Sequence, residues 1–155
     1  MIVSTDAFSG PDDCNCLAVR QAARHITQFY DQFLAPSGLR TTQFSILAKL
    51  RRVGPMTINA LAADLVMDRT TLGRNILPLE RDGLIAVDKG SRARRSKVVQ
   101  LTEAGEACFR AAVKGWVQAQ RQFGAAFGAK RTVDLRALLR AVAATDLTTA
   151  VGAEK

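Results

Sequence analysis

The segment that most constrains the fold runs from residue 68 to residue 81, where apolar side chains recur with helical spacing. At 100° per residue, Leu72, Ile76 and Leu79 gather on one side of a helix. The opposite side carries polar and charged side chains: Thr70, Arg74 and Arg81. The sequence therefore predicts an amphipathic helix with one face packed against a core and the other face free to meet a polar partner.

A basic loop at 89–97 follows this helix and lies between two short apolar runs, 84–87 and 98–101. Two such runs on either side of a loop predict a β-hairpin with basic residues at its tip. Between Arg69 and Lys97 there are eight lysines and arginines against three acids, which places +5 of the chain's net charge of +8 in this segment. Phosphate contacts need such a concentration of charge, although a solvated helix beside a charged loop would show it as well.

The residues before the amphipathic helix favour DNA over the solvated alternative. Thr57 is placed to cap a short helix that ends near residue 65. Val66 and Met67 then form a turn, and Asp68 caps the next helix. A helix, a short turn, a second helix and a wing are typical of a winged helix-turn-helix DNA-binding protein. We therefore expect a mainly α fold with a small β-hairpin wing.

Six helices account for the apolar spacing along the chain. The expected helices are 12–35, one from Thr41 or Thr42 to 53, 57–65, 68–82, 102–127 and a last one from Thr132. The fifth helix spans about 39 Å, which is long for one small domain. Its apolar residues are Val113, Trp116, Val117, Phe123 and Phe127. We expect the N- and C-terminal helices to form a homodimer over this surface, with intrachain packing as the alternative.

This interpretation divides the chain into parts. The expected parts are a flexible arm at 1–11 and one unit at 12–155, with a winged-helix part at 41–101 and dimerisation helices at 12–35 and 102–149. No apolar run is long enough to span a membrane, and the N-terminus lacks the pattern of a secretion signal. We therefore expect a cytoplasmic protein.

The residue types that catalysis and metal binding need are scarce. Three cysteines without a regular framework are expected to be reduced thiols. Cys14 and Cys16 with the distant His25 do not match a structural zinc site, so no metal is expected and no cofactor. With one histidine, no phosphate-binding glycine loop and no catalytic constellation, an enzyme is not expected either.

The order of these elements, together with five short motifs, resembles the MarR family of winged-helix transcriptional regulators. The motifs are GLRTTQFSIL at 38–47, LAADL at 61–65, DRTTL at 68–72, LERDGLI at 79–85 and LTEAG at 101–105. The resemblance covers roughly residues 13–145. It implies a homodimer that regulates transcription by binding a pseudo-palindromic operator in double-stranded DNA.

The resemblance also implies which residues meet DNA. Those at the major groove are Arg69, Thr70, Thr71 and Arg74. Those at or near the minor groove are the wing residues Arg92, Arg94 and Arg95, and the further basic candidates are Arg81 and Lys97. Guanidinium groups suit guanine edges and phosphates, and narrow minor grooves attract arginine. Many relatives carry an aspartate where this chain has Ala93, so we expect the wing to contribute charge more than fixed geometry.

Members of the family commonly release DNA when a small aromatic acid, a metal or an oxidant acts near the junction of the dimer and DNA-binding parts. Cys16 occupies the position of the reactive cysteine in the organic-hydroperoxide-sensing OhrR branch, and Tyr30 matches one of its tyrosines. The other two tyrosine positions hold Arg20 and Thr41, and Cys108 lies too early to match the usual resolving cysteine. The candidate effector residues are Cys14, Cys16, Arg20 and Tyr30.

Several functions stay open at this point. We expect a repressor that is released either by a small aromatic ligand bound between the first, second and fifth helices or by oxidation of Cys16 with organic hydroperoxide. The alternative interpretation is that both cysteines are ordinary small apolar residues at a helix start. The alternatives of a different class are a thiol-based peroxide-reactive enzyme and a non-specific DNA-binding or antitoxin-like module, which would not prefer an operator over random DNA.

Overall fold

The computed structural model describes residues 10–89 and 97–148, which form six α-helices and a three-stranded antiparallel sheet. The helices are α1 (Asn15–Leu34), α2 (Thr41–Val53), α3 (Ile58–Asp64), α4 (Arg69–Arg81), α5 (Glu103–Phe127) and α6 (Ala129–Ala144). The strands are β1 (Met56–Thr57), β2 (Ile85–Asp88) and β3 (Val98–Leu101), and short 3₁₀ helices lie at Pro11–Asp13 and Ala35–Ser37. The expected mainly α fold with a β-hairpin wing is confirmed.

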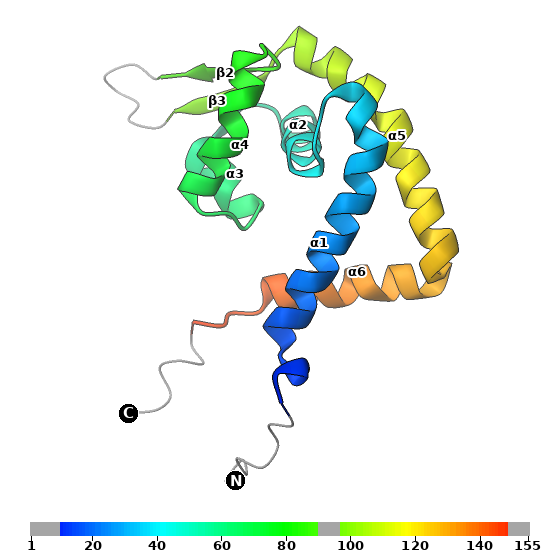
Figure 1. Ribbon diagram of the computed structural model, residues 1–155. Helices are drawn as coiled ribbons and strands as arrows, with labels where there is room; N and C mark the ends of the chain where they lie inside the picture. Colours follow the sequence, from blue (N-terminus) through cyan, green and yellow to red (C-terminus); the bar gives the residue numbers. More distant parts are fainter. Residues whose placement is uncertain (1–9, 90–96, 149–155) are drawn as a thin grey trace.

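The elements form two lobes (Figure 1). The winged lobe holds α2, α3, α4 and the sheet, and the long-helix lobe holds α1, α5 and α6. Helix α5 contacts both α1 and α2, so it joins the lobes along most of its length. Helix α6 leaves the end of α5 and crosses the molecule at the end away from the hairpin. The winged lobe and the long helices are therefore connected through α5 and the α1–α2 junction.

The helix-turn-helix has the caps that the sequence predicts. The Thr57 hydroxyl accepts a hydrogen bond from the Ala60 amide at 3.1 Å, and the Asp68 carboxylate accepts one from the Thr71 amide at 2.8 Å. Between the two helices Val66 adopts a φ of 52°, an uncommon left-handed conformation for a β-branched residue. The turn is short because this one residue reverses the chain direction, and it brings the start of α4 close to the end of α3.

The sheet contains one strand more than expected. Strands β2 and β3 pair antiparallel, with Val87 opposite Val99, so the predicted hairpin is confirmed. Strand β1 adds to the other edge of β3 and places Met56 opposite the same Val99. With two residues, β1 is too short to show an alternating pattern in the sequence. It ties the chain just before α3 to the base of the wing.

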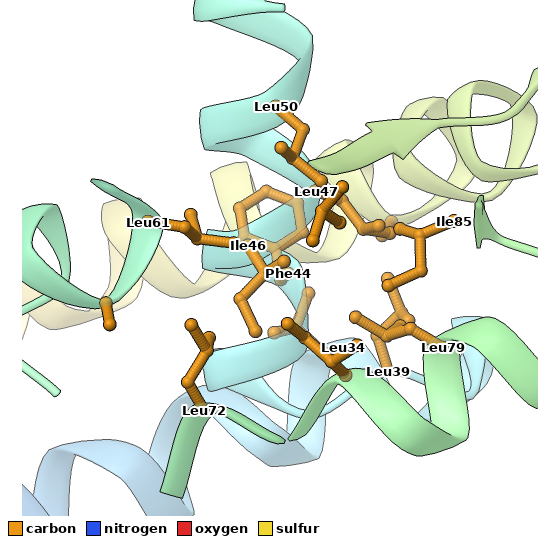
Figure 2. Packing of buried hydrophobic residues seen from close by; sticks show 14 residues of the cluster. Leu34, Leu39, Phe44, Ile46, Leu47, Leu50, Leu61, Leu72, Leu79 and Ile85 are labelled. Atoms are coloured by element: carbon orange, nitrogen blue, oxygen red, sulfur yellow. The ribbon is translucent and has the colours of Figure 1, made fainter. Parts of the chain in front are cut away.

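The core is centred on α2. Phe44, Ile46, Leu47 and Leu50 of this helix are buried and lie among apolar residues from the surrounding elements (Figure 2). Those neighbours include Leu34, Leu39, Leu61, Leu72, Leu79 and Ile85. The buried stripe predicted on the amphipathic helix, now α4, belongs to this core and is confirmed.

Two helix starts differ from expectation. Helix α2 has Arg40, and not Thr41 or Thr42, as its N-cap residue. Asp31 of α1 instead reaches across, and its carboxylate accepts hydrogen bonds from the Thr41 amide and hydroxyl, both at 2.7 Å. The expectation that α6 begins at Thr132 is wrong, because the helix begins at Ala129 and the Thr132 hydroxyl donates back to the Gly128 carbonyl at 2.8 Å.

The apolar surface of α5 is partly used inside the chain. Val113 and Trp116 pack against the core, and the Trp116 ring stacks on Phe44 with centroids 5.9 Å apart. Phe123 lies against Phe29 of α1 with centroids 6.4 Å apart. The sequence favoured a dimer interface for these α5 residues, with intrachain packing as the alternative. In the structure, Val113, Trp116 and Phe123 pack within the chain against α1 and α2.

Two glycines let backbone approach α5 closely. A Cβ on Gly115 would lie 2.1 Å from the Phe33 carbonyl oxygen at the end of α1, and a Cβ on Gly105 would lie 1.9 Å from the Leu84 carbonyl oxygen. Both distances are too short for any side chain. Gly124, on the same helix, has open space where a Cβ would go.

This difference predicts opposite effects for the same substitution on one helix. Gly115→Ala should lower the free energy of unfolding by about 1–3 kcal/mol, because the methyl group forces α1 and α5 apart. Gly124→Ala should raise it by up to about 1 kcal/mol, because alanine favours the helix and meets nothing. Urea unfolding followed by circular dichroism measures both. Equal stabilisation by the two variants would show that α1 and α5 are not in contact at Gly115.

Candidate nucleic-acid interface

Helix α4 has a buried face, which packs against the core, and an outer face, which is exposed. Leu72, Ile76 and Leu79 fix the helix against the core, so its rotation is determined by packing. Arg69, Thr70, Thr71, Arg74 and Arg81 are all exposed. The structure thus places the five predicted reading residues of this helix at the surface.

At the N-terminus of α4, the side chains of Thr70 and Thr71 differ in their hydrogen-bond partners. The Thr71 hydroxyl donates to the Asp68 carboxylate at 2.6 Å, and the Thr71 amide donates to the same side chain. The hydrogen bond from the Thr71 hydroxyl, and to a smaller extent the one from its amide, hold the pKa of Asp68 below its ordinary value. The capping carboxylate therefore stays ionised. Thr71 therefore serves the cap, and the described residues offer no such partner to the Thr70 hydroxyl.

The arginines of α4 differ in what holds them. Arg81 forms an exposed ion pair with Asp82 at 3.1 Å, which is a weak interaction in water. Within residues 10–89 and 97–148, no ion pair engages Arg69 or Arg74. Their guanidinium groups are therefore available to phosphates or to base edges.

The wing is described only at its base. Arg92, Arg94 and Arg95 lie outside the described residues. Lys97 is exposed directly before β3, and its carbonyl accepts a hydrogen bond from the Ile58 amide at 3.0 Å. This bond ties the base of the hairpin to the first residue of α3.

A cavity of about 380 Å³ opens behind this surface, where α1, α2 and α5 meet the helix-turn-helix. We call it the junction cavity. Its lining residues are Tyr30, Thr41, Phe44, Ser45, Ala48, Lys49, Arg52, Leu65 and Trp116. The sequence predicted a ligand pocket between the first, second and fifth helices but identified none of its residues except Tyr30 as a candidate effector residue. Only the packing of the three helices brings the others together.

The candidate effector residues do not form one cluster within the chain. Cys14 is the N-cap residue of α1, where its Sγ accepts a hydrogen bond from the Leu17 amide at 3.4 Å. Cys16 is exposed one turn before Arg20 on the same helix. Tyr30 lies fourteen residues beyond Cys16, which is about 21 Å along a helix. Within one protomer the structure therefore does not bring Cys16 and Tyr30 together.

Tyr30 has a partner of its own. Its hydroxyl donates a hydrogen bond to the Gln120 side chain of α5. Partial burial raises the pKa of Tyr30, against the opposing effect of the positive Arg136. The tyrosine is thus a neutral hydrogen-bonding group that links α1 to α5 at the edge of the junction cavity.

Other kinds of site are not seen in the part of the chain that the structure describes. No three histidine, cysteine, aspartate or glutamate side chains there are grouped as metal ligands. None of its helices combines the length and the apolar character needed to cross a membrane. Its three cysteines are free thiols.

Comparison with known proteins gives one family. A family model described as the MarR family matches residues 39–97. The M. tuberculosis transcriptional regulator MosR, solved in complex with DNA, is 39% identical, with a TM-score of 0.72 over 84% of this chain and 96% of that chain. A second crystal structure of MosR is 37% identical, with a TM-score of 0.72 over 90% of this chain and 100% of that chain.

Curated relatives match over shorter stretches. YwoH of Bacillus subtilis, an uncharacterised HTH-type transcriptional regulator, is 35% identical over 57% of this chain and 64% of its own length. The transcriptional activatory protein BadR of Rhodopseudomonas palustris is 38% identical over 44% of this chain and 41% of its own length. The chain therefore spans less than two thirds of the length of these two relatives.

The unpaired guanidinium of Arg74 on the outer face of α4 yields a specific prediction. Arg74→Ala should weaken binding to a selected operator by about 1–3 kcal/mol and weaken binding to random DNA much less, because a base contact carries sequence information. Fluorescence anisotropy with both DNAs at one salt concentration measures this. Arg121→Ala, which removes an exposed arginine from α5, is the charge-matched control. Equal losses on both DNAs would reduce Arg74 to a phosphate contact.

Proposed function

Because the chain belongs to the MarR family, we propose that it is a sequence-specific regulator of transcription that binds double-stranded DNA as a homodimer. The observation that carries the proposal is the outer face of α4, where Arg69 and Arg74 are exposed without an ion pair among the described residues. A capped helix-turn-helix and the hairpin base hold that face in place. The similarity to MosR, solved with DNA, supports it. Its proposed place of action is the cytoplasm, where operator DNA lies.

The proposed DNA contacts follow from this arrangement. Arg69, Thr70 and Arg74 enter the major groove, and Arg81 and Lys97 contact phosphates beside it. Thr71 acts through the Asp68 cap that it shares. The wing arginines Arg92, Arg94 and Arg95 stay in the proposal as minor-groove contacts on the basis of the family resemblance.

The homodimer is supported by apolar surface on α6 that residues 10–89 and 97–148 leave exposed. Leu138 of α6 is 67% exposed, and Val133 and Val142 of the same helix are 55% exposed each. A 16-residue helix with such exposure gains little from its own chain, and isolated helices of that length are marginal in water. An apolar cavity of about 390 Å³, lined by Phe29, Phe123 and other residues of α1 and α5, is a second such surface. A second copy would cover both.

Two measurements test the proposed DNA-binding dimer. Selection from a random DNA library should enrich a pseudo-palindrome with half-sites about one helical turn, or 34 Å, apart, because each protomer presents one α4. Sedimentation at micromolar concentration should give twice the chain mass of 16.7 kDa. A monomer in solution would contradict the dimer. A library without enrichment would favour the non-specific DNA-binding alternative.

We propose repression that an effector relieves, because the junction cavity lies directly behind the elements that position α4. A ligand that fills the cavity disturbs the DNA-binding form, which favours release over recruitment. BadR, a relative by sequence, is named as an activatory protein. A reporter gene placed behind the selected operator therefore decides the direction: expression should rise when this protein is deleted.

Thiol oxidation is a second proposed effector, and the exposed Cys16 beside the capping Cys14 favours it. In the first step the Cys16 thiolate attacks an organic hydroperoxide, which gives a sulfenic acid and the corresponding alcohol. Attack by the Cys14 thiol on the sulfenic sulfur then gives a disulfide and water. Because Cys14 Sγ accepts the Leu17 amide bond, this disulfide would remove the cap of α1.

This second proposal predicts that cumene hydroperoxide releases the protein from its selected operator and that Cys16→Ser abolishes the response. Cys108→Ser is the matched control, because that thiol is half-buried and burial raises its pKa. An electrophoretic shift with and without a thiol reductant measures release and reversal. Release of Cys16→Ser to the same extent as wild type would remove thiol oxidation as an effector. Repeated turnover of peroxide would instead indicate an enzyme.

A further inference from the structure

The outer face of α4 carries a large apolar side chain among its polar ones. Within residues 69–81, all of which the structure describes, Leu77 is the one large apolar residue that is exposed, at 65%. At 100° per residue it lies about 20° around the helix from Thr70 and about 60° from Arg74. Most other exposed apolar side chains of the described residues lie on α1 and α6, in the lobe assigned to the homodimer. A second copy therefore gives no reason for an exposed leucine on α4.

Gly73 lies one turn before Leu77, in the interior of α4. A glycine at such a position makes a helix less stable than alanine would. Packing within the described chain does not require it, because a Cβ on Gly73 would meet no atom within 4 Å, whereas Gly105 and Gly115 of α5 are in close contact with backbone. Side chains on a helix lean toward its N-terminus, so Leu77 lies over the turn that contains Gly73.

The space beside Gly73 and Leu77 is therefore open to a partner outside the chain. A helix residue without a side chain allows another molecule to approach the backbone closely. Leu77 supplies an apolar wall for whatever enters.

The neighbours of Leu77 select the partner. Arg74 precedes it by three residues and Arg81 follows it by four, so both guanidinium groups lie on the same side of the helix. A partner for this surface has to combine anionic or acceptor groups with a small apolar one. The major groove of DNA offers phosphates and guanine edges to the arginines, and its apolar group is the C5 methyl of thymine. The charge and the apolar wall together match a groove that contains thymine.

We propose that Leu77 recognises a thymine of the operator through its C5 methyl group, and that Gly73 lets α4 enter the major groove deeply enough for this contact. Leu77 lies about 4.5 Å beyond Arg74 along the helix axis. The thymine therefore lies within about two base pairs of the guanine that Arg74 contacts. This inference rests on the proposed function, and it adds a base to the recognition sequence together with the residue that selects it.

Replacement of thymine by uracil tests the contact, because uracil lacks only the methyl group. Each thymine of the selected operator is replaced in turn by deoxyuridine at the two symmetry-related positions, and fluorescence anisotropy measures the affinity of the full chain. At one position the affinity of wild type should fall about fourfold for each half-site, which is the value of one buried methyl group. The symmetric substitution should therefore weaken binding about sixteenfold.

Variants of Leu77 assign this preference to its side chain. Leu77→Ala should bind the thymine and uracil operators equally well, because the apolar contact is gone. Leu77→Met keeps an apolar side chain of similar volume and should keep the preference for thymine. Val53→Ala, which shortens an exposed apolar side chain at the end of α2, is the matched control and should discriminate as wild type does. Thermal unfolding of each variant establishes that it is folded.

Gly73→Leu tests the close approach. The new side chain meets open space in the free protein, and leucine favours a helix, so the midpoint of thermal unfolding should equal or exceed that of wild type. The affinity for the selected operator should fall at least about tenfold, because the added side chain holds α4 away from the bases. A purely structural role of Gly73 would lower both quantities.

The possible failures are distinguishable. A preference for thymine that Leu77→Ala retains, an operator affinity that no uracil substitution changes, or a selected operator without thymine within about two base pairs of a guanine would each overturn the inference and leave the proposed function intact. Unchanged operator affinity in Gly73→Leu would overturn the role of Gly73. A library without enrichment would overturn the proposed function itself, and this inference with it.

Discussion

The structure depends on the burial of α2 between the two lobes. Phe44, Ile46, Leu47 and Leu50 cover an arc of about 160° around this helix at 100° per residue, and each is almost fully removed from water. Burial of side chains of this size stabilises a fold by about 1.5–3 kcal/mol each. Because α2 is packed from several sides at once, α4, α5 and the sheet cannot shift independently of it. The position of the outer face of α4 therefore depends on packing against α2.

Charged side chains then fasten the elements around α2 to each other. Arg51 of α2 donates to both carboxylate oxygens of Glu106 on α5, at 2.9 and 3.0 Å, and Arg110 binds the same carboxylate. The hydrogen bonds from Arg51, and to a smaller extent the one from Arg110, hold the pKa of Glu106 below its ordinary value. The Arg51 guanidinium also lies over the Phe109 ring, 5.4 Å from its centroid. Each such contact is weak in water, and the two contacts of Arg51 join α2 to α5.

The proposed effectors enter at two ends of the same long-helix lobe. Cys14 and Cys16 lie at the start of α1, whereas Tyr30 and Asp31 near its end contact α5 and the start of α2. Among residues 10–89 and 97–148, Asp31 is the one α1 residue whose side chain accepts a hydrogen bond from the α2 backbone. A displacement of α1, from an altered cap or from a filled cavity, therefore reaches α2 through this carboxylate.

The sequence alone was sufficient for several features that rest on a local pattern of residues. They are the apolar stripe of α4, the caps at Thr57 and Asp68, the hairpin and the charge around α4. Local signals were misleading at two helix starts, and at one of them a distant residue intervened. Thr41 resembled a cap, but Asp31 serves that end of α2, and Thr132 resembled a helix start although its hydroxyl bonds within the helix.

Only the tertiary structure decided which of many similar side chains meet. The chain has 22 lysines and arginines and 14 aspartates and glutamates, so the sequence offers no reason to pair Lys49 with Asp64 rather than with another acid. The close approach at Gly115 and the two-residue β1 were equally invisible. The physical reason is that helix propensity and capping act over one or two turns. Contacts between helices depend instead on how whole apolar faces pack around α2, and that packing also creates the junction cavity and brings the Lys49–Asp64 pair to it.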